Sequence, residues 1–334
     1  MKPQSIRCKP EGSQVAPAWL LLLCVGHFMG GGSSVIANLL HAVWSFPLTR
    51  FFVFVLILLL TLIFTEPMLL SILSGFGVKG TLPLLLFSEI YHLIFCLGLF
   101  VIFVRFIERA KLEDFGFKTE NAAKNLFLGA GFGTFLVVLM VLVMYAMGVY
   151  HPVKINSAHD LLLSAVTLLF AAATEELIFR AYFLTILEKH WGTIAAIVVS
   201  SLGFGFAHIL NEAGGAAVAE KLLFCTFLSL EAGLSLAACY VFTRDIWMAI
   251  TAHWMWNYFE GPIFGTHVSG ADFGKSLIDA SLTGPDLLTG GKFGPEGNLV
   301  CLLVGTVGGI ALLYLASKRN HLISYAQARG KHDG

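Results

Sequence analysis

The stretch LLLSAVTLLFAAATEELIFR, residues 161–180, decides what kind of protein this chain forms. It opens with residues 161–173, which carry no charge, and then places Glu175, Glu176 and Arg180 close together. A run of roughly 20 mostly apolar residues can span the hydrocarbon core of a bilayer as one helix. Charged side chains inside such a helix are costly, so each of them suggests a function. The stretch therefore predicts a transmembrane helix that carries part of a functional site.

The whole chain has the same apolar character. Of its 334 residues, 57% are hydrophobic and only 13% are charged, and the mean hydropathy is +0.80. Soluble domains are about 45–50% apolar and about a quarter charged, so this chain has too little polar surface for a particle surrounded by water. The formal net charge is zero, which provides no basic field for nucleic acid. We expect an integral membrane protein with lipid, and no nucleic acid, as a partner.

Apolar runs bounded by charges, glycines or prolines predict an all-α polytopic membrane fold with about eight transmembrane helices. These runs cover residues 51–73, 83–105, 123–150, 159–187, 191–210, 217–242, 245–262 and 298–317. We divide the chain into an N-terminal segment (1–50), a transmembrane domain (51–317) with its functional core at 159–262, and a cytoplasmic tail (318–334). Residues 18–44 fit an additional span, an interfacial helix or a signal peptide, and the sequence leaves these alternatives open.

The distribution of basic residues predicts the orientation. If the eight spans alternate, the loops on one side carry most of the Lys and Arg residues, namely Arg105, Arg109, Lys111, Lys118, Lys124, Lys189, Arg244, Lys318 and Arg319. Basic residues in short loops favour the cytoplasmic side, so both flanks of the eight-span domain are expected there. The Gly-rich segment 284–297 then belongs to an extracytoplasmic loop.

The glycine pattern Gly129-Ala-Gly131-Phe-Gly133 is not a nucleotide-binding fingerprint. No strand precedes it and an apolar run follows it, whereas a dinucleotide site needs a strand before the glycines and a helix after them. Small residues allow transmembrane helices to approach closely. We therefore expect these glycines to lie at a helix–helix contact.

The charged residues of the fourth predicted span differ in their surroundings. Glu176 and Arg180 are four residues apart with the acid first, which is the favourable order for an ion pair on a helix. Adjacent helical residues point about 100° apart, so Glu175 faces in another direction and has no such partner. Glu175 is therefore the candidate for chemistry.

Two later spans carry further polar pairs with the spacing of one helical turn. Phe204 and His208 share a helix face, which allows the phenyl ring to pack on the imidazole, and His253 and Asn257 share another. Each pair alone more often has a structural role. Five polar or ionisable groups within three predicted spans, however, favour a shared site. If the loop after the fourth span centres on Lys189, helix rise puts Glu175 and His208 about 21 and 28 Å from it. A common site then needs tilted helices.

Taken together, the three motifs resemble the CAAX protease and bacteriocin-processing family, also called the Abi family. They are Glu175-Glu176-x-x-x-Arg180, Phe204-x-x-x-His208 and His253-x-x-x-Asn257. The resemblance covers residues 159–262, and this family is related to the eukaryotic CAAX prenyl endopeptidase. The run 256–270 is similar to that of bacterial members, so we expect the bacterial cytoplasmic membrane as the location.

This resemblance implies a peptidase that needs no cofactor. Glu175 and His208 would activate a water molecule, and His253 and Asn257 would stabilise the oxyanion, as a preorganised donor can by about 3 kcal/mol. The implied supporting residues are Glu176, Arg180 and Phe204. The implied substrate is a peptide or protein with a membrane-associated C-terminal or transmembrane segment. We expect the cavity to lie between the fourth and seventh spans and to open toward the cytoplasmic half.

Three other interpretations remain at this point. Glu175, His208 and His253 match a catalytic zinc set of one carboxylate and two imidazoles. A non-catalytic peptide-binding or immunity protein would have the same membrane fold. Glu89, His92 and Glu231 also lie in predicted spans, where polar residues can line an ion path. However, Glu89 and His92 are spaced to pair with each other, and no inverted repeat supports transport.

Overall fold

The computed structural model describes residues 43–211, 215–271, 273 and 275–330. The chain divides into two compact units, Met1–Arg50 and Phe51–Gly334. Most of the segment 18–44, whose status the sequence leaves open, lies outside the described residues. The second unit contains all eight predicted spans and the whole predicted core.

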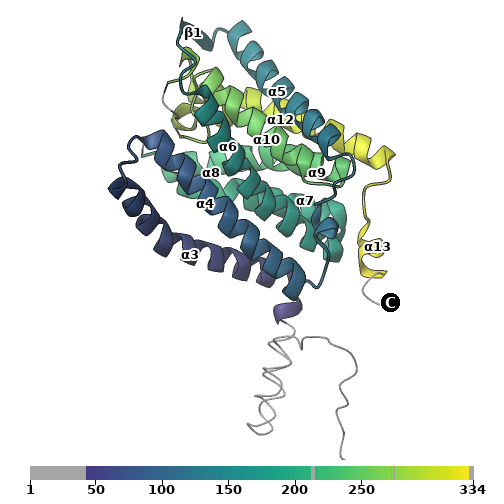
Figure 1. Cartoon of the computed structure of the whole chain (residues 1–334). Helices are drawn as coiled ribbons and strands as arrows, with labels where there is room; N and C mark the ends of the chain where they lie inside the picture. Colours follow the sequence, from purple (N-terminus) through teal and green to yellow (C-terminus); the bar gives the residue numbers. More distant parts are fainter. Residues whose placement is uncertain (1–42, 212–214, 272, 274, 331–334) are drawn as a thin grey trace, which may run out of the picture. The chain divides into compact units, whose positions relative to one another are not determined.

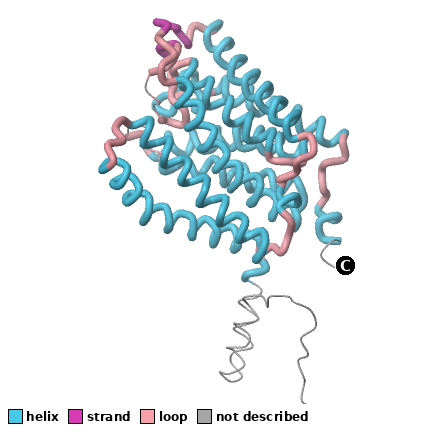
Figure 2. Tube along the Cα trace, viewed as in Figure 1, coloured by secondary structure: helices cyan, strands magenta, loops and turns pink. Residues whose placement is uncertain are grey.

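Helices make up most of the second unit (Figures 1 and 2). All eight apolar runs fold as helices, which confirms the all-α polytopic membrane fold. The long helices are α3 (Pro47–Gly75), α4 (Thr81–Ile102), α5 (Ala122–Ala146), α6 (Leu161–Glu176), α7 (Thr185–Ala207), α8 (Val218–Leu228), α9 (Leu234–Thr243), α10 (Trp247–Tyr258) and α12 (Leu299–Lys318). The short helices are α11 (Asp286–Thr289) and α13 (Tyr325–Gly330), together with the 3₁₀ segments η2 (Leu112–Phe115), η4 (His208–Leu210), η7 (Gly291–Phe293) and η8 (Pro295–Gly297).

Within the described part of the chain, six helical segments are long and apolar enough to cross a membrane. One of them, Leu161–Leu210, contains both the fourth and the fifth predicted runs. Its helix is broken at Gly192, where φ is 77° and the backbone is not helical. Helix α10 has 12 residues, which is too short to cross alone. The number of eight spans therefore stays a prediction.

Several helices widen into π-helical segments. Such segments are rare in proteins, and those that occur often lie at functional sites. These segments are η1 (Phe103–Ile107), η3 (Leu177–Leu184), η5 (Ser229–Gly233) and η6 (Phe259–Ile263). Three of them adjoin or contain acidic residues of the core: η3 follows Glu176, η5 contains Glu231 and η6 contains Glu260. The π-helical geometry thus occurs where the membrane domain carries buried charge.

Two short strands, which the sequence did not predict, pair at one end of the helices. Strand β1 (Tyr150–Ile155) follows α5, and β2 (Ile278–Leu282) lies in the long segment between η6 and α12. They are antiparallel, with an irregularity between Pro152 and Lys154. Proline has no backbone N–H for the ladder, which suits an irregular edge position. The pairing joins two loops that the span pattern assigns to the same side.

The loops that carry the basic residues contact one another. The Ile246 N–H donates to the carbonyl of Gly116 over 3.1 Å, and Arg244 Nη1 lies 2.6 Å from Glu188 Oε2. These contacts connect loops after the second, fourth and sixth predicted spans, so their placement on one side is confirmed. That this side faces the cytoplasm stays a prediction.

Helix α10 packs against α5, α6 and α9. A Cβ atom on Gly129 would lie 2.2 Å from the carbonyl oxygen of Met248, and one on Gly133 would lie 2.1 Å from that of Ala252. A Cβ on Gly131, in contrast, would meet nothing within 4 Å. The expected close helix contact is therefore confirmed for Gly129 and Gly133. It brings α5 against the helix that carries His253 and Asn257.

Candidate active site

A cavity of about 280 Å³ lies between the helices and the segment that precedes α12. Its lining includes four polar or charged residues that the sequence analysis selected for chemistry, Glu175, His208, His253 and Asn257, and the ring of Phe204. The two remaining predicted residues, Glu176 and Arg180, lie behind this wall and are almost completely buried. The structure thus brings together residues from α6, η4 and α10 that are far apart in the sequence.

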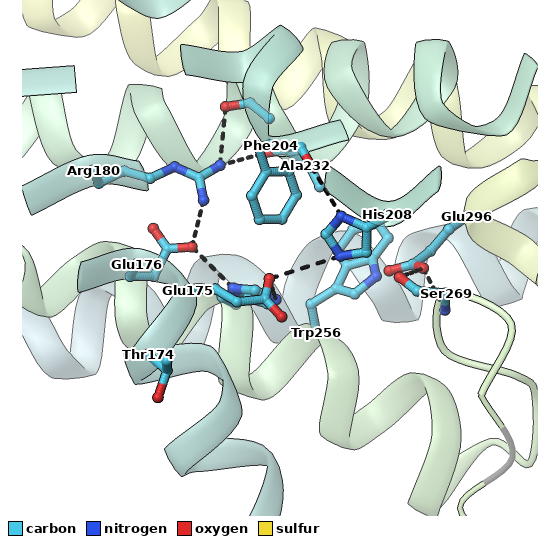
Figure 3. Close-up of polar contacts among 12 residues, drawn as sticks. Thr174, Glu175, Glu176, Arg180, Phe204, His208, Ala232, Trp256, Ser269 and Glu296 are labelled. Carbon is cyan, nitrogen blue, oxygen red and sulfur yellow. Dashed lines mark hydrogen bonds and ion pairs between the residues drawn. The ribbon is translucent and has the colours of Figure 1, made fainter. Parts of the chain in front are cut away.

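Glu175 stands at the centre of this arrangement (Figure 3). Its Oε2 atom lies 3.8 Å from Nε2 of His208 and 4.0 Å from Nε2 of His253. The same oxygen is buried and has no hydrogen-bond partner among the described residues. The sequence analysis had left Glu175 without the ion-pair partner of its neighbour, and the structure agrees while adding the two imidazoles beside it.

The end of α7 fixes the orientation of the His208 ring. Helix α7 stops at Ala207, and Nδ1 of His208 lies 2.9 Å from the carbonyl oxygen of Phe204, one turn earlier. A carbonyl oxygen can only accept, so Nδ1 carries the proton in this bond. In the neutral ring, Nε2 is then unprotonated. His208 consequently presents a basic nitrogen toward Glu175.

Glu176 connects two of the other site residues. Its Oε1 atom accepts a 2.6 Å hydrogen bond from Arg180 Nη1, which confirms the predicted ion pair. The same atom lies 2.9 Å from Nδ1 of His253, a contact that the sequence analysis missed. His253 therefore donates through Nδ1 and turns Nε2 toward Glu175. The two adjacent carboxylates face different surroundings, one in the cavity wall and one fully buried.

Arg180 holds this network against η5. Its Nη2 atom donates to the carbonyl oxygen of Gly233, the last residue of the π-helical segment η5, over 3.2 Å. Its guanidinium lies 4.2 Å from the centroid of the Phe204 ring, in cation–π geometry. The same ring packs on His208 at 5.0 Å and edge-on to His253 at 5.9 Å. The predicted packing of Phe204 on His208 is confirmed.

Three further carboxylates, Glu89, Glu231 and Glu296, line the same cavity. Glu89 lies 3.7 Å from Nδ1 of His92, so the expected pairing of these two residues is confirmed. His92 also lies 3.3 Å from Glu66 on α3. The sequence analysis did not select Glu296, because an acid in a glycine-rich loop is most often solvated.

The lining also corrects one expectation about the cavity. We expected it to open toward the half that carries the basic loops, but none of those loops lines it. Instead, Val268, Ser269 and Glu296 contribute from the segment on the opposite side. The physical reason is depth: Glu175 and His208 are a nearly complete helix length away from the break at Gly192.

The zinc interpretation of Glu175, His208 and His253 stays an alternative, with donor atoms slightly farther apart than in a closed zinc site. Zinc holds its ligands at about 2.0–2.2 Å, so neighbouring ligand atoms in a tetrahedron lie roughly 3.3–3.6 Å apart. The atoms of His208 and His253 stand farther than this from Glu175. Across the described residues, no group of three or more His, Cys, Asp or Glu side chains has an arrangement that could hold a metal ion.

A comparison with known protein families assigns this core. Residues 157–259 match the sequence model of type II CAAX prenyl endopeptidases, described as Rce1-like. The matched segment contains the three motifs, from Glu175 to Asn257, and the residues before and after it lie outside the match. No curated protein and no solved structure matches the chain.

Proposed function

We propose that this chain, an integral membrane protein of the CAAX protease-like family, hydrolyses peptide bonds with a water molecule activated by Glu175 and His208. The match of residues 157–259 to this family supports a protease, and the mechanism is our proposal. One observation carries it: the Nε2 atoms of two histidines converge on the free carboxylate oxygen of Glu175. Such a cluster of acid, base and donor in a cavity is the usual form of a hydrolytic site.

The separation of Glu175 and His208 supports a bridging water molecule. Their 3.8 Å distance is too long for a direct hydrogen bond, and a small separation of the two side chains admits one water between them. A carboxylate and an unprotonated Nε2 are both acceptors. A shared water therefore donates both protons to them and turns its lone pairs toward the substrate. This orientation is the one that nucleophilic attack on a carbonyl carbon requires.

The chemical steps follow from these positions. The water oxygen bonds to the scissile carbonyl carbon while Glu175 takes one proton from the water. The other water proton stays on the oxygen and donates a hydrogen bond to Nε2 of His208. The resulting tetrahedral intermediate breaks its C–N bond as Glu175 returns the proton to the leaving amine. A positioned general base contributes about 10²–10⁴ in rate. No covalent bond to the protein forms in this sequence.

In this proposal, His253 and Asn257 stabilise the oxyanion of the tetrahedral intermediate by donating hydrogen bonds to it. Because Nδ1 of His253 donates to Glu176, Nε2 carries a proton only in the imidazolium form, and the Glu176 carboxylate 2.9 Å away favours that form. The Nε2–H then donates to the developing oxyanion. Asn257, one turn later on α10, lines the same cavity and provides an amide donor. Loss of one such donor typically costs about 10²–10³ in kcat.

The substrate class follows from the membrane setting. A protease whose site lies among apolar helices acts on segments that enter or border the bilayer. We propose peptides or proteins with a membrane-associated C-terminal or transmembrane segment as substrates, in the bacterial cytoplasmic membrane. Prenylated CAAX tails, which the family description names, are one member of this class.

Cleavage of a quenched-fluorescent library of membrane peptides by the purified protein tests the proposal. Wild type, Glu175→Gln and His208→Ala are compared, each with and without a strong zinc chelator. We expect cleavage by wild type alone, unchanged by the chelator. Loss of cleavage on chelation and its recovery with zinc would favour the metal mechanism. Equal cleavage by all three proteins would contradict the assigned site, and well-folded wild type without turnover would favour a binding protein.

A further inference from the structure

The cavity that contains Glu175 is strongly acidic. Its lining includes the four carboxylates Glu89, Glu175, Glu231 and Glu296, and among the described residues no Lys or Arg lines it. Most of the remaining lining is apolar, so the charges act in a medium of low dielectric constant. The His253 imidazolium, which also lines the cavity, offsets at most one of these four acids. A cavity with more acids than cations favours a cationic guest.

The carboxylates differ in whether the protein itself provides a partner. Glu89 lies beside His92, and the buried Glu176 behind the wall is paired with Arg180. Glu231 is only 1% exposed, yet its Oε1 has no hydrogen-bond partner among the described residues. Buried carboxylates without a partner are unusual because their desolvation is not compensated. Among the described residues, Glu231 is thus a cavity-lining acid whose Oε1 atom has no partner, although the Cys301 thiol and the Ala232 N–H donate to its carboxyl group.

The position of Glu231 is enforced by close packing. The residue lies on the π-helical segment η5, and α12 passes directly against it. A Cβ atom on Gly305 of α12 would lie 2.8 Å from Cβ and 3.0 Å from Oε2 of Glu231. Glycine therefore gives the carboxylate its space beside the helix backbone. The packing holds the carboxyl group in the cavity wall and away from water.

Glu296 brings a second carboxylate to the same region. It is 3% exposed, and its Oε2 accepts 2.6 Å hydrogen bonds from the backbone N–H and the hydroxyl of Ser269. Burial raises the pKa of the Glu296 carboxyl above its ordinary value, and the Glu231 and Glu296 carboxylates interact electrostatically. Figure 3 shows Glu296 on the side of His208 that faces away from Glu175. The two acids therefore border the catalytic residues.

We infer that Glu231 and Glu296 form a subsite for a cationic side chain, lysine or arginine, of the peptide substrate. This inference rests on the proposed peptidase function and specifies its substrate. The long apolar stem of such a side chain fits the apolar walls, while its charged end reaches the carboxylates. No metal-binding group of three or more residues competes for this role among the described residues. The substrate thus carries a basic residue within a few positions of the scissile bond.

A lysine scan of one cleaved peptide tests this inference. Lysine and its uncharged analogue norleucine are placed in turn at each position within four residues of the scissile bond, and kcat/KM is measured with purified wild-type protein. The readout is the ratio of the lysine to the norleucine value at the best position. In wild type, kcat/KM should be about thirtyfold higher for the lysine peptide than for the norleucine peptide. This factor is the lower end of the loss observed when one partner of a buried charge pair is removed.

The same ratio is measured for Glu231→Gln, Glu296→Gln and the control Glu89→Gln, which removes a cavity-lining carboxylate that already has a histidine partner. We expect the ratio to fall to near one in the first two variants and to stay within about threefold of wild type in the control. Equal cleavage of both peptides by wild type would overturn the inference, as would an equal fall in all three variants. If Glu231→Gln does not fold, Glu296→Gln decides. Failure of the proposed function would differ, because wild type would then cleave no peptide at all.

Discussion

Glu176 and His253 are joined by a hydrogen bond of 2.9 Å between Oε1 and Nδ1, although they lie on different helices and 77 residues apart. The same oxygen accepts from Arg180 at 2.6 Å. Glu175, the adjacent residue, instead presents a free oxygen to the cavity. The neighbouring carboxylates therefore have separate tasks in our account: Glu176 positions His253, and Glu175 carries out the chemistry.

Replacement of Glu176 by glutamine should destabilise the protein severely. The side chain is 0% exposed, and its loss of charge leaves the guanidinium of Arg180, which is 1% exposed, without a counter-ion. Removal of one partner of a buried pair costs about 3–5 kcal/mol. Reversible unfolding of Glu176→Gln in detergent measures this change in the free energy of unfolding.

The double variant Glu176→Gln/Arg180→Met provides the control for that measurement. Because it removes both charges, it should lose less stability than the sum of the two single variants. A decrease below about 1 kcal/mol for Glu176→Gln alone would show that the pair is not structural.

Phe204→Leu should lower the rate more than the affinity. The ring contacts the guanidinium of Arg180 and both imidazoles, so its removal loosens His208 and His253 together. Small displacements of catalytic groups cost about tenfold to a hundredfold in rate. We expect a fall of that size in kcat, with KM within about threefold of wild type, from steady-state peptide cleavage.

Phe179→Leu is the matched control, because Phe179 packs edge-on to Phe204 at 5.3 Å. In the part of the chain that the structure describes, the two histidine rings contact Phe204 and not Phe179. Its kcat should stay within about threefold of wild type. Equal losses of kcat in the two variants would mean that Phe204 acts through general packing and not through the histidines.

Gly133→Ala and Gly131→Ala should have opposite effects. A methyl group at Gly133 would lie 2.1 Å from the carbonyl of Ala252, next to His253, so α10 must shift. Overpacking of this kind costs about 1–3 kcal/mol, and we expect kcat to fall as well. A methyl group at Gly131 meets nothing within 4 Å, and alanine favours the helix by roughly 0.8–1 kcal/mol. Unfolding and cleavage of the two variants are compared; a stable, active Gly133→Ala would contradict the close contact.

Much of the site could be predicted because helix periodicity fixes which neighbours share a face. The pairing of Glu176 with Arg180 and the packing of Phe204 on His208 both follow from a spacing of four residues. The depth of the residues was predicted less well, because the sequence suggested a turn at Lys189. The structure has the break at Gly192, with φ at 77°.

Counting from Gly192 removes the apparent mismatch in depth. Glu175 precedes it by 17 residues and His208 follows it by 16, so both lie about 25 Å away along their helices. The rings of Phe179 and Phe204 meet at 5.3 Å, one turn nearer to the break. Gly192 was a possible signal for this break, since glycine adopts a positive φ without strain. A single glycine in an apolar run, however, is also compatible with a continuous helix or a close helix contact.

Other features depend on tertiary contacts that local patterns do not reveal. The bond from Glu176 to His253 joins α6 to α10, and Glu296 reaches the cavity from a loop that reads as solvent-exposed. The strands β1 and β2 are short and pair over more than 120 residues of sequence. Neither carries a strong alternation of apolar and polar residues, so the pattern gave no indication of them.

The most direct test of the account is the value of kcat/KM for Glu175→Gln on a peptide that wild type cleaves. This variant removes the proposed base while its side chain stays nearly isosteric and partly exposed in the cavity wall. We predict a loss of at least about 10³-fold, with an unfolding midpoint within about 2 °C of wild type because the buried Glu176–Arg180 ion pair stays intact. A variant that keeps more than about a tenth of the wild-type activity would contradict the role of Glu175 as the catalytic base.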